Sequence, residues 1–167
     1  RAFLASPGQR LTRGAVARLL YESAGQPAAH EECPFSDVSE KDAAAVGWAA
    51  GQGYLTGVGD GTYEPGRPVT RQEFAAILWR QAGTPEVPVQ GLERFGDAGT
   101  VSEWARDAVL WCQQAGVMAG RSGDKLAPED TITTAEAMSG SSGTIWRSLP
   151  HTTGRWAPRG RPMQSGI

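Results

Sequence analysis

One helix-start pattern occurs three times, and this internal repeat is the feature that most constrains how the chain can fold. The copies are Leu11-Thr12-Arg13, Val69-Thr70-Arg71 and Ile132-Thr133-Thr134, which lie 58 and 63 residues apart, each after a proline at the same distance. A shift of 58 residues also aligns the apolar positions of the helix in the second copy with those of the helix in the first. We therefore divide the chain into the end of a first repeat (1–25), a full second repeat (35–83) and a third repeat (95–138) whose second helix is interrupted.

The second repeat predicts a turn-rich loop that leads into a helix. Residues 57–68 hold four glycines and two prolines, so tight turns are expected there. Thr70 and Glu73 have the spacing of a capping box, in which each side chain accepts a hydrogen bond from the other residue's backbone N–H. One face of the predicted helix carries Phe74, Ile77, Leu78 and Gln81. Gly83 supplies the left-handed residue that ends it.

Each full repeat also predicts an earlier helix, at about residues 41–52 and 102–114. The linkers at 26–34 and 84–92 are rich in Pro, Ala, Glu and Gln, so we expect them to be exposed. Tryptophans at helical spacing are expected in the core: Trp48, Trp79 and Trp111. Because one helix pair cannot bury its apolar face alone, we predict an all-α fold of helix–loop–helix repeats that pack on one another.

Composition excludes several function classes. A net charge of −2 argues against a nucleic-acid binder, and no apolar run approaches the roughly 18 residues of a membrane span. Cys33 and Cys112 have no metal-like spacing and are interpreted as unpaired thiols. The sequence shows no Ser-His-Asp order, and its histidines, His30 and His151, fall in predicted loop or tail. We therefore predict no catalytic residue, no metal and no cofactor.

Charge changes abruptly after Met138. Residues 139–167 hold four arginines and no acid, whereas the remainder carries a net charge of −6. Ser-Gly-Ser-Ser-Gly at 139–143 is typical of flexible linkers. We expect 139–167 to be a disordered basic tail, although contact of this tail with an anionic polymer is an alternative. A shifted reading frame, a fusion and a natural tail remain open as its origin, and because the chain starts at Arg1 in mid-pattern we interpret it as a fragment or processed product.

The repeats resemble the S-layer homology (SLH) family. The resemblance rests on Phe35-Ser36-Asp37-Val38, a helix with Trp48, the G-D-G-T-Y-E-P run at 59–65 and Thr70-Arg71-Gln72-Glu73, and it covers about residues 3–138. It implies a pseudo-threefold arrangement of three modules with helices at the centre. It further implies binding of secondary cell-wall polysaccharide, commonly ending in a pyruvylated amino sugar, in grooves between modules. The expected location is extracellular, on the cell wall or S-layer of a bacterium.

The resemblance and the residue chemistry together give a set of candidate ligand-binding residues: Arg71, Arg13, Thr70, Glu73, Asp37, Asp97 and Trp104. Arg71 lies in the first turn of a helix, where unpaired N–H groups and the helix dipole favour an anion such as a ketal carboxylate. Aspartates can hydrogen-bond sugar hydroxyls, and Trp104 can pack on a pyranose ring. The alternatives are an Arg71 that is solvated and pairs with Glu73 or Asp60, and an Asp37 that only closes a turn.

Three positions depart from the family pattern. Lys41 stands where the second repeat should have the equivalent of Trp104, Ala15 replaces the capping-box glutamate of the first repeat, and Thr134 replaces the arginine of the third. We therefore expect one or two binding sites rather than three, with Arg71 best placed. A non-catalytic anchor for a bacterial surface protein is the leading hypothesis, and an SLH-fold protein-interaction module that has lost sugar binding is the alternative.

Overall fold

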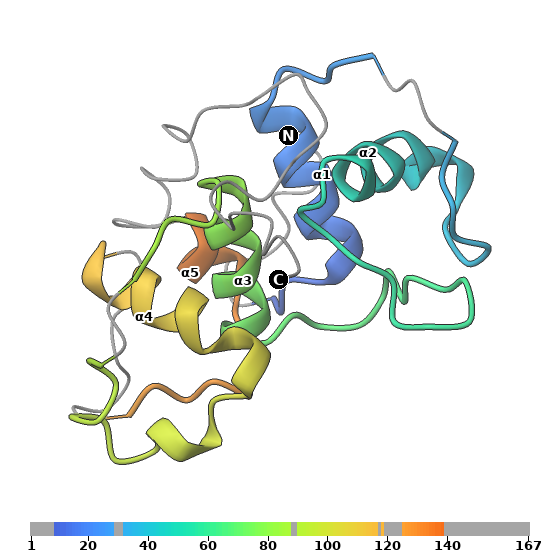
Figure 1. Ribbon diagram of the computed structural model, residues 1–167. Helices are drawn as coiled ribbons and strands as arrows, with labels where there is room; N and C mark the ends of the chain where they lie inside the picture. The colour runs from blue at the N-terminus through green and yellow to red at the C-terminus, as the bar shows by residue number, and fades with distance from the viewer. Residues whose placement is uncertain (1–8, 29–31, 88–89, 117, 119–124, 139–167) are drawn as a thin grey trace, which may run out of the picture.

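The structure is a computed structural model that describes residues 9–28, 32–87, 90–116, 118 and 125–138 (Figure 1). Its elements in chain order are α1 (Arg13–Ser23), α2 (Glu40–Gly51), α3 (Arg71–Gln81), the short 3₁₀ helices η1 (Ala98–Thr100) and η2 (Glu103–Ala105), α4 (Arg106–Gln114) and α5 (Thr134–Met138). These described residues contain isolated β-bridges but no strand. The fold is all-α, as predicted. The expected interruption after Met138 and the basic tail 139–167 lie outside the described residues.

Helices pack in pairs that cross the repeat boundaries. α1, from the first repeat, packs on α2 of the second, and α3 of the second repeat packs on α4 of the third (Figure 1). The residues that the repeat spacing aligns are all buried: Val16, Leu19 and Leu20 of α1, and Phe74, Ile77 and Leu78 of α3. The unit that buries a hydrophobic core is therefore made of two neighbouring repeats.

The helix starts follow the capping chemistry that the sequence predicts. At α3, Thr70 Oγ1 accepts from the N–H of Glu73, and the Glu73 carboxylate accepts from the N–H of Thr70, so the capping box is confirmed. Thr133 and Glu136 make the same pair of bonds at α5. At α1, Thr12 caps alone by accepting from the Ala15 N–H. Gly83 has φ +90° just beyond α3, which is the expected left-handed stop.

A closed cycle of backbone hydrogen bonds joins the residues two positions before α1, α3 and α5. The Leu11 N–H donates to Ile132 O (2.9 Å), the Ile132 N–H to Val69 O (3.0 Å) and the Val69 N–H to Leu11 O (2.8 Å). All three side chains are buried. The three helix starts, far apart in the sequence, are thereby held against one another.

The core differs from the sequence expectation at two places. Trp48 is buried as predicted, whereas Trp79 and Trp111 are only partly buried and pack against the core from its edge. The linker at 84–92 is only partly exposed as predicted: Glu86 and Gln90 are exposed, whereas Leu92 is buried and Val87 packs on the core. Trp79 Nε1 also donates to Pro85 O, which holds this linker against α3. The predicted helix at 102–114 begins as the 3₁₀ turn η2 and becomes α-helical only at Arg106.

Candidate functional site: the junctions between repeats

Arg13 lies at the junction between the first and second repeats, and its side chain is almost fully buried. Its Nε donates to Tyr63 O (2.7 Å) and its Nη2 to Thr56 O, both in the loop that precedes α3. The guanidinium lies over the Tyr63 ring, 4.4 Å from the centroid, and the Tyr63 hydroxyl donates to Arg13 O (2.9 Å). The helix-start arginine of the first repeat thus holds the loop of the second.

Two glutamates and a second arginine complete this first junction. Glu73 Oε2 lies 3.6 Å from Arg13 Nη1 and 2.8 Å from Arg67 Nη2, while Arg67 Nε lies 3.2 Å from Glu64 Oε2. Burial lowers the pKa of the Arg13 guanidinium, and the charge of Arg67 lowers it further, whereas Tyr63 and Glu73 raise it. The sequence analysis did not single out Arg67. Its position in the turn just before the capping box could have indicated that it lies close to Glu73.

Arg71 occupies the equivalent place at the junction between the second and third repeats. Its Nε donates to Leu126 O (2.9 Å), and its Nη1 lies 3.6 Å from Glu136 Oε2. The residue is 5% exposed. The alternative of a solvated Arg71 paired with Glu73 or Asp60 is therefore wrong.

At the corresponding position of the third repeat, Thr134 Oγ1 donates to Gln9 O (3.3 Å). This bond runs back from the third repeat to the segment before α1. Thr134 has a shorter side chain than the arginines of the other two junctions, but it makes a contact across the same kind of boundary.

The N–H groups at the helix starts are occupied by the neighbouring repeat. Arg13 N donates to Arg67 O and Gly14 N to Pro65 O, and in the same way Arg71 N donates to Asp130 O and Gln72 N to Pro128 O. The expectation that unpaired N–H groups at Arg71 await an anion is therefore wrong. These donors stabilise the packing of one repeat on the next, which is an alternative way to satisfy a helix start.

Asp37 and Asp97 both clamp a loop. Asp37 accepts from the N–H groups of Tyr63 and Glu64, and Asp97 from those of Leu126 and Ala127, all at 2.8 Å. The hydrogen bond from Tyr63 is the main cause of a lowered pKa at Asp37. At Asp97, burial acts to raise the pKa, but the hydrogen bonds from Leu126 and Ala127 outweigh it and lower the pKa. Both carboxylates therefore stay ionised at neutral pH and fix the loops that border the junctions.

Trp104 is the most exposed large apolar side chain among the described residues, at 56%. It lies on η2, which is held against the start of α3 because Ser102 exchanges two hydrogen bonds with the Gln72 side chain. The structure thus brings Arg13, Thr70 and Glu73 together at the first junction. Arg71 and the loop clamped by Asp97 lie at the second, and η2, which carries Trp104, borders the α3 start beside it.

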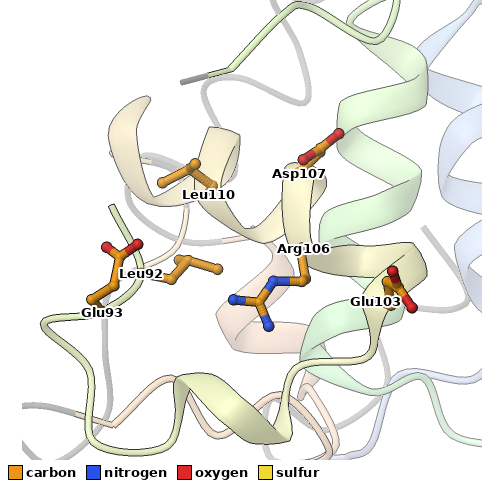
Figure 2. Close-up of a pocket in the computed structure, with 6 residues that line it drawn as sticks. All are labelled: Leu92, Glu93, Glu103, Arg106, Asp107 and Leu110. Atoms are coloured by element: carbon orange, nitrogen blue, oxygen red, sulfur yellow. The ribbon is translucent and has the colours of Figure 1, made fainter. Parts of the chain in front are cut away.

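A separate cleft of about 240 Å³ lies between the third repeat and the segment just before it, and is shown in Figure 2. It is lined by Leu92, Glu93, Glu103, Arg106, Asp107 and Leu110, and the Arg106 side chain points into the space between Glu93 and Glu103. Three carboxylates against one guanidinium give this lining a net negative charge, so it opposes an anionic ligand. None of the predicted ligand-binding residues lines it.

The described part of the chain contains no group of three or more His, Cys, Asp or Glu side chains placed to hold a metal ion. Within the same residues, no helix has the length and apolar character needed to cross a membrane. Cys33 and Cys112 are both free thiols, as predicted, and burial raises the pKa of Cys112.

Comparison with known proteins identifies the family. The S-layer homology domain profile matches residues 34–75 and 94–138, which is more than half of the chain, and the chain belongs to this family. SLH domains are non-catalytic modules that attach bacterial surface proteins to cell-wall polymers. The resemblance inferred from the repeats is thereby confirmed.

Similar curated proteins are large glycoside-degrading enzymes. The chain is 25% identical over 150 residues to an endoglucanase of Bacillus sp. (strain KSM-635), covering 87% of this chain and 16% of that enzyme. It is 32% identical over 105 residues to endo-1,4-beta-xylanase A of Thermoanaerobacterium saccharolyticum, and 31% identical over 108 residues to exoglucanase XynX of Acetivibrio thermocellus. These matches cover 61% and 63% of this chain but only 9% of each enzyme.

Proposed function

We propose that this chain anchors a bacterial surface protein to the cell wall by binding secondary cell-wall polysaccharide that ends in a pyruvylated amino sugar. The binding surfaces are the junctions between repeats. The chain carries no catalytic role of its own, and the protein it belongs to is extracellular, held at the cell wall or S-layer.

The three repeats, at 1–25, 35–83 and 95–138, are proposed to surround an approximate threefold axis. Support comes from the closed cycle of hydrogen bonds among Leu11, Val69 and Ile132. Further support comes from the equivalent donations of Arg13, Arg71 and Thr134 N–H groups to the segment before the next helix, since Thr134 N donates to Gln9 O. Each repeat then contributes a helix start to one junction and a loop to the preceding one.

The observation that carries the binding proposal is the equivalent placement of Arg13 and Arg71 at two junctions. Each guanidinium lies 3.6 Å from a glutamate oxygen, which is longer than an N–H···O hydrogen bond. While Nε of each arginine stays bonded to a loop carbonyl, a ligand carboxylate can compete with that glutamate for Nη1, and a charge-assisted hydrogen bond contributes about 1.5–3 kcal/mol. Thr70, Glu73, Asp37 and Asp97 hold the surrounding backbone in place.

Trp104 is proposed to supply the apolar contact. A pyranose ring has an apolar face, and a large exposed aromatic side chain beside the second junction can cover it. The second repeat has Lys41 at the equivalent position, so this contact belongs to one junction only.

The test is sedimentation of the chain with purified cell-wall sacculi, with and without pyruvyl groups. Wild type should bind the pyruvylated sacculi and lose binding when the pyruvyl groups are removed. Trp104→Ala should weaken binding, whereas Val58→Ala, which truncates the other large exposed apolar side chain of the described residues, should not. Arg71→Ala should weaken binding about ten- to hundredfold, with Arg71→Lys intermediate, provided that circular dichroism shows a folded protein.

The second candidate is a protein-interaction module that has lost sugar binding. Thr134 at the third junction favours it, because one of the three equivalent positions has no arginine. Absence of wild-type binding to any sacculus preparation would support this candidate and refute the anchoring proposal.

A further inference from the structure

The Gln72 side chain joins the start of α3 to the 3₁₀ turn η2 of the next repeat. Its Nε2 donates to Ser102 Oγ (3.0 Å), and its Oε1 accepts from the Ser102 N–H (2.9 Å). Gln72 is buried, so both hydrogen bonds are shielded from water. Because the donor and the acceptor of one amide bind the same residue, the amide fixes Ser102 against α3 in two directions at once.

Trp104 lies two residues beyond Ser102 and projects from η2 into solvent. Its side chain is exposed, whereas Val101 and Ala105, close to it in the chain, are buried. The turn η2 has three residues, and Ser102 at its N-cap makes no side-chain capping bond to it. A 3₁₀ turn of this length has little stability of its own, so the position of the indole depends on what holds Ser102.

The other two helix starts lack an amide side chain at this position. By the repeat spacing, Gly14 and Ala135 are the equivalents of Gln72. The Gly14 N–H donates to Pro65 O just as the Gln72 N–H donates to Pro128 O, so the backbone role is the same. A Cβ at Gly14 would lie 3.1 Å from Pro65 O, which leaves little room for a side chain there. Of the two junctions with an arginine, the second therefore has both the amide clamp and the exposed tryptophan.

We propose that Gln72 is a positioning residue for sugar binding at the second junction: its clamp on Ser102 holds η2 so that the Trp104 indole lies where a pyranose ring packs. This rests on the proposed wall-binding function. Gln72 does not touch the sugar and acts through Trp104. Because Gln72 directly follows Arg71, one helix start carries both the arginine proposed to bind the ligand carboxylate and the amide that holds the aromatic contact. The ligand class is a sugar that presents a carboxylate together with an apolar ring face.

The first measurement needs no ligand. Fluorinated tryptophan incorporated into the whole chain gives each tryptophan a fluorine NMR resonance, and Trp104→Phe assigns the one from Trp104. Gln72→Met keeps the length of the side chain but removes both hydrogen bonds, so the Trp104 resonance should shift or broaden while that of buried Trp48 stays in place. Ser102→Ala removes only the Oγ acceptor and should give a smaller change. Gln114→Met is the matched control on an exposed position of α4 and should move neither resonance. An unchanged Trp104 resonance in Gln72→Met overturns the proposal.

The second measurement is binding of the same variants to pyruvylated sacculi, with circular dichroism as the check on folding. Trp104→Ala should weaken binding up to about tenfold, Gln72→Met about three- to tenfold, and Ser102→Ala by less. The double variant Gln72→Met/Trp104→Ala should bind like Trp104→Ala alone, because the clamp acts only through the indole. Binding of Gln72→Met within twofold of wild type, an equal loss in Gln114→Met, or losses that multiply in the double variant overturn the positioning role. If wild type fails to bind, the anchoring function itself has failed, and the fluorine NMR result alone decides whether Gln72 holds Trp104.

Discussion

Replacement of Arg13 by alanine should destabilise the fold far more than its position in the first turn of a helix would suggest. The change removes the donors to Tyr63 O and Thr56 O, the ion pair with Glu73 and the stacking on the Tyr63 ring. The change leaves the buried carbonyl of Tyr63 without its donor. The largely buried Glu73 carboxylate then faces one arginine, Arg67, instead of two. A buried carbonyl left without its donor costs about 1–3 kcal/mol, and loss of a buried cation–π contact adds about 2 kcal/mol, so we expect Arg13→Ala to cost about 3–5 kcal/mol in total.

The measurement is urea denaturation followed by circular dichroism, with thermal unfolding alongside. A loss of about 3–5 kcal/mol corresponds to a fall of roughly 10–20 °C in melting temperature for a domain of this size. Arg18→Ala is the control on the same helix. Arg18 makes one ion pair, at 2.9 Å with Asp42, whose carboxylate is itself buried, so its loss should cost about 1–3 kcal/mol, less than the loss of Arg13. Equal stability losses in Arg13→Ala and Arg18→Ala would refute the view that Arg13 ties the repeats together.

Three further outcomes are expected. Thr70→Ala removes a capping box and should cost about 1 kcal/mol of unfolding free energy by urea denaturation, with the α3 start fraying first; an unchanged stability would contradict the role of the cap. The Asp37 carboxylate has a lowered pKa in the fold, so its contribution is present above the unfolded pKa of about 4 and is lost as pH falls through the folded value. The difference in melting temperature between wild type and Asp37→Asn should therefore be present at pH 7 and shrink below pH 4. A difference that persists in acid would contradict a stabilising role of the ionised Asp37 carboxylate. A thiol reagent should label Cys33 rapidly in the native protein and buried Cys112 only on unfolding, and rapid native labelling of both, followed by mass spectrometry, would show that α4 opens.

Local signals predicted much of the fold. Thr70, Glu73 and Gly83 fix the start and end of α3 through hydrogen bonds and backbone angles that involve only neighbouring residues, and the structure has them as expected. The apolar face of α3 was equally visible, because helical periodicity depends on side-chain spacing alone. The family followed from the same repeated motifs.

The ligand-binding roles of the candidate residues stay predictions. The surroundings of these residues could not be predicted from local sequence, because they depend on contacts between distant parts of the chain. Arg71 was expected to hold an anion at an open helix start, with a solvated side chain as the alternative. It is instead buried, and Leu126, 55 residues away, supplies the acceptor for its Nε. Asp37 similarly clamps a loop 26 residues further on. No local sequence pattern predicts contacts between residues so far apart in the chain.

What the sequence by itself determined is therefore the family, the positions of the main helices and the cap of α3, since these depend on spacing and on bonds within a few residues. Only the tertiary structure decided which repeat each arginine contacts, which helix-start N–H groups are already paired, and that the Gln72 side chain holds the turn that carries Trp104. The physical reason is that burial and the local charge balance are sums over all neighbours in space, and the neighbours of Arg13 and Arg71 come from the next repeat.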